Sequence, residues 1–171
     1  LFGIAPYFND ATIINFVTRV SFLFTTLFGF SLLRDERPLA RSPWFWTGFA
    51  FTAGGLGVMY IGGRGSSSSS TAGMLILLGA AACWGLYSVL VRRFLSGYSA
   101  RLSFGIISLY AAPFLLGLMF LLGDWRALFH LTLLQWFLLW LSAVAGIALG
   151  HTFFYQAIHA LGPVTSEGGL L

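Results

Sequence analysis

Residues 102–122 read LSFGIISLYAAPFLLGLMFLL and contain no Asp, Glu, Lys or Arg. A helix of about 20 residues crosses the hydrocarbon core of a bilayer, which is about 30 Å thick. Four further stretches have a similar length and composition: Ala11–Leu33, Trp44–Gly63, Ala72–Val91 and Leu133–Tyr155. Arg19 is the only ionised side chain inside any of the five. The pattern predicts an all-α membrane protein, a polytopic bundle of five complete transmembrane helices with partial helices at both ends.

The overall composition also indicates a protein that is embedded in a lipid bilayer, which is its first expected partner. Of 171 residues, 58% are hydrophobic and 8% are charged, whereas soluble domains carry about 25% charged residues. The net charge is +4, but the arginines lie in short segments between apolar spans and form no stripe, so we expect no nucleic-acid partner. The single cysteine, Cys83, lies inside an apolar span; it forms no internal disulfide and we expect it to be buried.

The charged connections predict an orientation. Basic residues follow the first and third spans, namely Arg34, Arg37 and Arg41 after the first and Arg92, Arg93 and Arg101 after the third. The other two connections hold only Arg64 and Arg126. Because short cytoplasmic loops are enriched in Lys and Arg, the first span should run from outside to inside, with His159 at the inner face. We expect a multi-pass protein of a cell membrane, most simply a bacterial inner membrane.

A Gly/Ser-rich segment, residues 64–71, predicts a flexible linker between residues 1–63 and 72–171. The segment is either a loop between two hairpins or a boundary between repeated modules. A weak internal similarity favours the boundary. Ile4–Ala11 leads to Asn15, and Gln156–Pro163 leads to Glu167, each as a short break followed by an apolar run with a polar residue. By the predicted orientation the two breaks lie on opposite sides, as in inverted-repeat transporters.

Several segments also resemble a known family. Gly79–Val89, reading GAAACWGLYSV and followed by Arg92 and Arg93, resembles the opening helix of an EamA repeat. Phe154–Ser166 resembles the junction between the third and fourth helices of that repeat. Leu32–Pro38 resembles the end of a fourth helix, and Gly48–Gly57 resembles a Gly-rich fifth helix. The sequence is therefore similar to the EamA-domain family of the drug/metabolite transporter superfamily.

The resemblance implies a ten-helix transporter made of two inverted five-helix repeats, with both termini in the cytoplasm. On that template the chain would be a fragment. It would hold the tail of helix 3, helices 4 to 8 and the start of helix 9. Residues 1–63 would then be the C-terminal part of the first repeat, and residues 72–171 the truncated second repeat.

The first candidate for a substrate contact is Arg19, since an ionisable group inside the bilayer normally faces a cavity or a partner. Helical spacing places it on one broad face with other polar and small residues, namely Asn15, Thr18, Phe22, Thr25, Thr26 and Gly29. In the family, the fourth helix of each repeat lines the pathway. Arg19 is not part of the general family pattern, and it either tunes the choice of substrate, for example toward anionic solutes, or pairs with a carbonyl or headgroup and only stabilises packing.

Glu167 is the only carboxylate outside the predicted loops. A carboxylate that is partly withdrawn from water can take up and release protons during transport. We therefore consider Glu167 the candidate coupling residue. The alternative is a position among the lipid headgroups with no functional role.

The remaining candidate substrate contacts are aromatic or imidazole side chains inside spans: Trp84, Tyr87, Tyr110, His151 and Tyr155. Aromatic faces can stack on flat solutes or hold cations, although most intramembrane aromatic residues only pack. His151 and His159 lie eight residues apart, about 12 Å along a helix, and no nearby Cys or Asp completes a metal site. We expect no metal, no cofactor and no catalytic residues.

Small residues and a proline predict structural features. Ser142, Gly146 and Gly150 recur every four positions and should form a groove for a neighbouring helix. Gly48, Gly54, Gly55 and Gly57 are candidates for the same role. Pro113 should kink the middle of its span, either as a hinge or as a fixed bend.

These observations favour a secondary transporter of a small metabolite, which would work by alternating access through a cavity between two inverted repeats. A proton or an exchanged solute would supply any coupling, because the sequence has no nucleotide-binding Gly-x-x-x-x-Gly-Lys loop. The alternatives are a membrane-embedded enzyme and a membrane scaffold without a pathway. The scaffold predicts that the face from Asn15 to Thr26 contacts protein throughout.

Overall fold

The computed structural model describes residue 8, residues 11–63 and residues 71–169. The described residues form helices and their connections, and no strand occurs among them. The linker at 64–70 lies outside the described residues, and so does the first member of the weak internal similarity, apart from residues 8 and 11. The chain forms two compact units, one of residues 1–94 with 161–171 and the other of residues 95–160.

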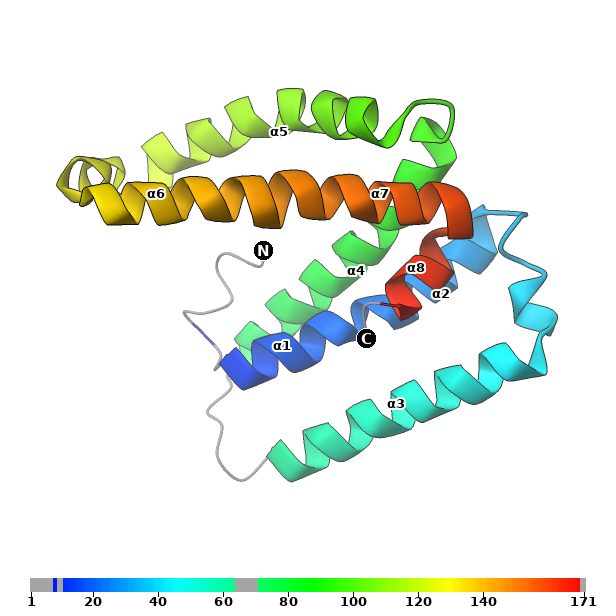
Figure 1. Ribbon diagram of the computed structural model, residues 1–171. Coiled ribbons are helices and arrows are strands. Elements are labelled where there is room, and N and C mark those ends of the chain that lie inside the picture. The colour runs from blue at the N-terminus through cyan, green and yellow to red at the C-terminus, as the bar shows by residue number, and fades with distance from the viewer. Residues whose placement is uncertain (1–7, 9–10, 64–70, 170–171) are drawn as a thin grey trace. The chain divides into compact units, whose positions relative to one another are not determined.

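The first unit contains α1 (Ala11–Arg19), α2 (Ser21–Leu32), α3 (Pro43–Gly63), α4 (Thr71–Leu95) and α8 (Pro163–Gly168). Figure 1 shows α8, from the end of the chain, lying beside α2. A short 3₁₀ turn, η2 (Leu39–Arg41), leads into α3.

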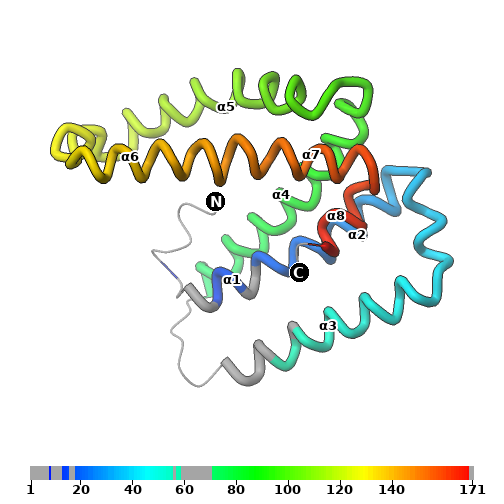
Figure 2. Tube along the Cα trace, in the orientation of Figure 1, coloured from blue at the N-terminus to red at the C-terminus, as the bar shows by residue number. Residues whose placement is uncertain are grey.

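The predicted single span Ala11–Leu33 is wrong in one respect, because the helix is interrupted between α1 and α2. At Val20 the α-helical pattern gives way to a tighter turn, in which the Leu23 N–H donates to the Val20 carbonyl at 3.0 Å. The chain then continues into α2 (Figure 2). The break follows directly on Arg19, so the charged residue ends α1 and does not lie in the middle of a continuous helix.

The core of the first unit forms where α4 meets α1 and α2. Leu77 of α4 is fully buried and packs against Ile13 and Ile14 of α1. Further along α4, a Cβ on Gly85 would lie 2.7 Å from the backbone nitrogen of Thr25. The two helix backbones therefore approach as closely as glycine permits. This is the small-residue contact that allows helices to associate closely in membranes.

Aromatic rings join α3 to α2. The ring of Phe22 lies 5.7 Å from that of Phe49, and the ring of Phe30 lies 5.4 Å from that of Phe45. Trp46 packs on Phe49 and donates its indole N–H to the Ala40 carbonyl at 2.7 Å. Aromatic pairs at these distances stabilise beyond their area burial alone, and they fix the connection after α2.

The second unit is a helical hairpin. It consists of α5 (Ala100–Leu122), the 3₁₀ turn η3 (Trp125–His130), α6 (Leu133–Ser142), the π-helix η4 (Ala143–Leu149) and α7 (Gly150–Leu161). Figure 2 shows the last three as one continuous run that returns along α5. Ser99 caps α5 by accepting from the Leu102 N–H, and a capping box of Thr132 and Gln135 begins α6.

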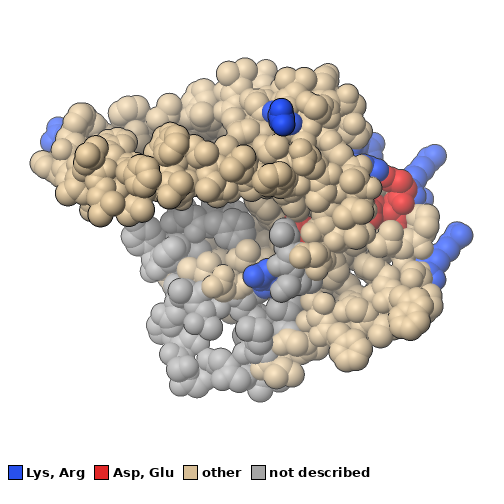
Figure 3. Space-filling model, viewed as in Figure 1, with Lys and Arg blue, Asp and Glu red and all other residues tan. Residues whose placement is uncertain are grey.

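Three of the described helical runs are long and apolar enough to cross a membrane: Thr71–Leu95, Ala100–Leu122 and Leu133–Leu161. Ser21–Leu32 is apolar but shorter. Large apolar side chains are exposed along α5 and α6, including Leu122 at 83% and Leu133 at 87%. Charged side chains are few on the face shown in Figure 3. These features confirm the prediction of an all-α protein with apolar helices long enough to cross a membrane, whereas the five complete spans stay a prediction.

Several predictions about small residues differ from the structure. Gly48, Gly54, Gly55, Gly57 and Gly146 have no atom within 4 Å of an added Cβ, so among the described residues no helix occupies the predicted grooves. The close contacts are made by Gly29 and Gly85 instead.

Two further predictions concern single residues. The expectation that Cys83 is buried is wrong, because its side chain is exposed on α4. Helix α5 continues without interruption through Pro113, and the hinge stays a prediction.

Candidate transport site around Glu167

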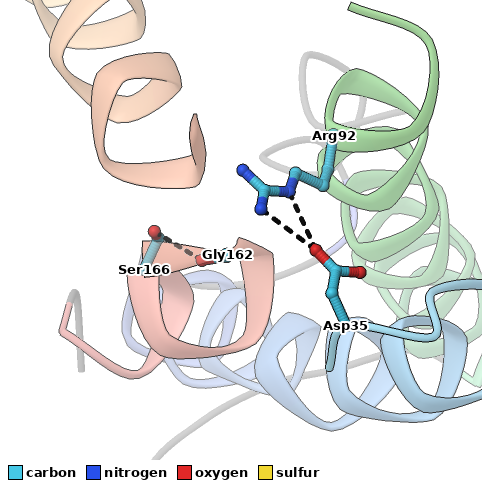
Figure 4. Close-up of polar contacts among 4 residues, drawn as sticks. All are labelled: Asp35, Arg92, Gly162 and Ser166. Carbon is cyan, nitrogen blue, oxygen red and sulfur yellow. Dashed lines mark hydrogen bonds and ion pairs between the residues drawn. The ribbon is translucent and has the colours of Figure 1, made fainter. Parts of the chain in front are cut away.

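The short helix α8 carries Glu167 into the interior of the first unit. Gly162 precedes the helix with a φ of +85°, a conformation that favours glycine, and Pro163 occupies the first turn, where its lack of an N–H costs nothing. The Ser166 hydroxyl donates to the Gly162 carbonyl at 2.7 Å (Figure 4). Val164 packs on α2, where a Cβ on Gly29 would lie 2.7 Å from its side chain. These contacts fix the helix and leave Glu167 only 4% exposed.

Two donors on one face of α4 hold the Glu167 carboxylate. The Trp84 indole N–H donates to Oε1 at 2.5 Å, and the Ser88 hydroxyl lies 3.2 Å from the same oxygen. Trp84 and Ser88 are four residues apart, so they lie one above the other along the helix. Ser88 is fully buried. A buried carboxylate is stable only when such partners compensate for the lost water.

The break between α1 and α2 contributes two more groups. The Ser21 side chain, at the start of α2, makes a further hydrogen bond to Glu167, and the Arg19 charge interacts favourably with the carboxylate. Arg19 itself is exposed. The interruption of the helix thus brings a cation and a hydroxyl to the same carboxylate, and Arg19 and Glu167, both candidates from the sequence, are parts of one cluster.

The polar face predicted for residues 15–29 divides into two parts. Asn15 is exposed and Thr18 is half-buried, with its hydroxyl bonded to the Ile14 carbonyl at 2.6 Å. Thr25 and Thr26 are buried, and the Thr25 hydroxyl bonds to the Ser21 carbonyl at 3.0 Å. The part on α1 is therefore open, whereas the part on α2 packs against protein.

The aromatic candidates separate between the two units. Tyr87 lies beside Trp84, with ring centroids 5.6 Å apart, and so adjoins the Glu167 cluster through that ring. In the second unit, His151 packs edge-on against the fully buried Tyr155, and its Nδ1 lies 3.0 Å from the Ile147 carbonyl. Tyr110 is 74% exposed on α5.

A shallow groove of about 600 Å³ lies elsewhere in the second unit, at one end of the hairpin. It is lined by Ser99, Ala100, Arg101, Gln156, His159 and Ala160. His151 and Tyr155 are not among its lining residues, so the structure does not join these candidates to the groove.

The ends of α2 and α4 meet, although the sequence gave their arginines no specific partners. Arg92 reaches Asp35 with two nitrogens, at 3.0 and 3.2 Å (Figure 4). Arg93 donates to the Leu32 carbonyl at 2.9 Å and satisfies the end of α2. Both arginines lie in the last turn of α4 and not in the following loop. Positive charges in the last turn of a helix interact favourably with the helix dipole. The contact places these two basic segments at the same end of the first unit, and their orientation in a membrane stays a prediction.

Glu36 is the residue at this end that sequence reasoning treated as an ordinary loop acid. It is 2% exposed and accepts a hydrogen bond from the Val164 N–H of α8. Burial, together with the Asp35 charge, raises the pKa of the Glu36 carboxyl from 4.5 to about 7. The Val164 N–H and the Arg92 charge oppose that rise. Its neighbour Asp35 is half exposed, so the sequence held no signal that separates the two acids.

Ser88 and Ser21 are the members of the Glu167 cluster that the sequence analysis did not single out. The spacing of Ser88 from Trp84 was a usable signal, because residues four apart share a helix face. Ser21 had no such signal, since its position depends on the break at Val20. Within the described residues, no group of three or more His, Cys, Asp or Glu side chains could hold a metal ion.

Comparisons with known proteins identify the family of the chain. Neither the curated proteins nor the solved structures include a significant match. A model of the EamA-like transporter family matches residues 71–166, which is more than half of the chain. The match contains Trp84 and Ser88 and ends just before Glu167. The chain therefore belongs to the EamA-like transporter family, whose members are membrane transporters of the drug/metabolite superfamily.

Proposed function

We propose that the protein is a secondary transporter of a small metabolite and that Glu167 is its coupling residue. The single observation that carries the proposal is the buried Glu167 carboxylate, which is held by Trp84 and Ser88 between apolar helices. An ionisable group in such a place is costly and is retained for ion or solute pathways. Family membership supplies the independent reason to expect transport.

The cluster contains the parts that a coupled cycle needs. The carboxylate can hold a proton or pair with a cationic group of the solute, and the Arg19 charge interacts favourably with it. Trp84 and Tyr87 provide adjoining aromatic faces on which a flat solute can stack. Competition between the proton and the solute for Glu167 would couple their movements. The solute that fits this chemistry carries an amine or another hydrogen-bond donor together with an apolar or planar part.

The proposal includes the architecture implied by the family. Residues 1–63 form the end of the first repeat, residues 64–71 the linker and residues 72–171 most of the second repeat. The full protein then has ten helices, spans a cell membrane several times, most simply a bacterial inner membrane, and alternates access to a cavity between the repeats. The five complete spans include α3 and the broken pair of α1 and α2. Its partners are the lipid bilayer, the solute and either a proton or an exchanged solute.

Proton flux tests the proposal directly. The full-length protein is reconstituted into liposomes that contain a pH-sensitive dye, and a panel of cationic, zwitterionic and anionic metabolites is added outside. At least one metabolite should drive a change in internal pH, and Glu167→Gln should abolish it while Glu167→Asp retains part of it. Asp124→Asn, which neutralises an exposed loop carboxylate, is the matched control. Solute-driven proton movement that survives Glu167→Gln would overturn the assignment of Glu167.

A membrane scaffold is the second candidate, and one observation favours it. Thr25, Thr26 and Gly29, which belong to the predicted pathway face, are packed against protein. A scaffold would show no solute-dependent flux with any member of the panel. It would also leave no water at the α1 part of the face, where the transporter requires it.

A further inference from the structure

Glu36 is a buried carboxyl group that the proposed function does not use. It lies in the connection between α2 and η2, where the flanking residues Asp35 and Arg37 are exposed. Its Oε2 atom is buried and makes no hydrogen bond within the described structure. Leaving a buried acceptor without a partner costs free energy. The contacts of the Glu36 carboxyl with the turn before α8 indicate why it is buried.

The turn before α8 is shaped to receive this carboxyl. Gly162 has a φ of +85°, and a Cβ added there would collide with Oε1 of Glu36. The carboxyl accepts from the Val164 N–H, which is one of the first N–H groups of α8 and has no partner within its own helix. The glycine therefore serves two purposes, the left-handed backbone and the space for Glu36.

The same short helix carries Glu167. Val164 and Glu167 are three residues apart, about 4.5 Å along the helix axis. Glu36 therefore holds one end of α8 while Trp84 and Ser88 hold the other through Glu167. A helix of less than two turns moves as one body, so a displacement at its start moves the carboxylate at its end.

We propose that Glu36 is a positioning residue for Glu167: its carboxyl group, seated against Gly162 and Val164, fixes α8 and so holds Glu167 against Trp84 and Ser88. The proposal rests on the proposed function only for the role of Glu167 in transport. The positioning itself is a structural claim, and it can be tested without a known solute.

The protonation of Glu36 gives the contact a pH dependence. The charged groups that act on it are Asp35 of its own connection and Arg92 of α4, and α8 contributes the backbone N–H of Val164. Since burial raises its pKa to about 7, the carboxyl is neutral and well accommodated below neutral pH. Above that pH it ionises, and a buried charge with one unpaired oxygen favours release into water. The contact should loosen as the pH rises through about 7.

A spin-label distance between α2 and α8 tests the proposal. Leu27 and Thr165 are both exposed, so Leu27→Cys and Thr165→Cys can carry labels in full-length protein that contains Cys83→Ser. Distance distributions are recorded in lipid between about pH 5.5 and about pH 8.5. The background protein should show a narrow distribution at low pH that broadens with a midpoint near pH 7.

The variants separate positioning from protonation. Glu36→Gln keeps a neutral side chain and should give the narrow distribution at every pH. Glu36→Ala and Gly162→Ala should give the broad one at every pH, the first by removing the contact and the second by blocking it. Asp124→Asn, the exposed control, should behave as the background protein. A narrow distribution in Glu36→Ala would overturn the positioning role, and a pH transition that persists in Glu36→Gln would overturn the role of its proton.

Glu167→Gln in the same labelled protein keeps the two proposals apart. Glu36 still seats α8 in this variant, so the pH-dependent change should persist even though proton-coupled flux is lost. Persistence of flux in Glu167→Gln would refute the proposed coupling and leave the positioning of α8 intact. Loss of the pH transition in Glu167→Gln would instead show that Glu167 controls the helix, contrary to the inference.

Discussion

Replacing Gly85 with alanine tests the helix crossing on which the candidate site depends. The new Cβ would lie 2.7 Å from the Thr25 nitrogen and 2.9 Å from the Phe24 Cβ. Neither atom can rotate away, because one is backbone and the other is attached to it. The helices α2 and α4 must therefore move apart by several tenths of an ångström. Overpacking of this kind costs about 1–3 kcal/mol.

A matched glycine isolates the steric cost. Alanine stabilises an exposed helix interior by up to about 1 kcal/mol relative to glycine, and both substitutions share that gain. Gly54 of α3 has no atom within 4 Å of an added Cβ, so Gly54→Ala shows the gain alone. The difference between the two variants should be about 1–3 kcal/mol. For a chain of this size that corresponds to a Tm difference of about 2–12 °C.

Thermal unfolding in detergent, followed by tryptophan fluorescence at one heating rate, measures this difference. Gly85→Ala should unfold at the lower temperature. Gly85→Ser should behave similarly, since its Cβ meets the same atoms. Equal Tm values for Gly85→Ala and Gly54→Ala would refute the close crossing, and with it the placement of Trp84 and Ser88 against α8.

The remaining predictions concern the carboxylates and their partners. Trp84→Phe removes the indole donor but keeps the ring, so it should lower proton-coupled flux in the dye-loaded liposomes by roughly tenfold, the equivalent of about 1.4 kcal/mol for one charge-assisted hydrogen bond to Glu167; unchanged flux would argue against that hydrogen bond. Asp35→Asn breaks a partly exposed ion pair with Arg92 and should lower stability by no more than about 1 kcal/mol, measured as a small fall in Tm; a larger loss would assign this pair a structural role. Glu36→Gln should remove one contribution to the pH dependence of stability. The folded-state pKa of Glu36 is raised from 4.5 to about 7, so its contribution is full below pH 4.5, falls by up to about 3 kcal/mol as the pH rises to about 7, and changes little above it. Tm values across this range should therefore fall more for the wild type than for the variant, and parallel profiles would contradict the raised pKa.

The helices themselves were predictable because length and composition decide them. The stretches 44–63, 72–91 and 102–122 match α3, α4 and α5 closely, since each is an uninterrupted apolar run of the length a bilayer requires. The interruption at Val20 was not predictable in the same way. No Pro or Gly marks it, and the tighter turn there shows only in the folded chain, where the Leu23 N–H donates to the Val20 carbonyl. The π-helix at Ala143–Leu149 likewise has no signal in its seven apolar and small residues.

The glycines show why composition alone does not find helix contacts. Gly146 and Gly85 lie in similar small-residue patterns, yet only Gly85 meets another helix in the described structure. Gly85 meets Thr25, which lies 60 residues earlier in the sequence. The pattern of small residues on one helix carries no information about such a distant partner. The same holds for Gly29 and Val164, whose contact positions the helix that bears Glu167.

Of the two buried carboxylates, one was identifiable from the sequence and the other was not. Glu167 was identifiable because it is an acid within an apolar segment. Glu36 was not, because it stands in the sequence Arg-Asp-Glu-Arg, which is typical of a solvated loop. Its burial follows from the turn at Gly162, more than 120 residues later, and only the folded chain brings them together.

Water access at Thr18 tests most directly whether this family member contains a transport pathway beside the Glu167 cluster. Thr18→Cys is introduced into full-length protein that carries Cys83→Ser. A membrane-impermeant thiol reagent is then added to each side of oriented vesicles in turn. We predict labelling from both sides, with a rate that changes when a transported solute is added. Complete protection of Thr18→Cys from both sides, in protein that is correctly inserted and labelled at an exposed Ser31→Cys control, would contradict it.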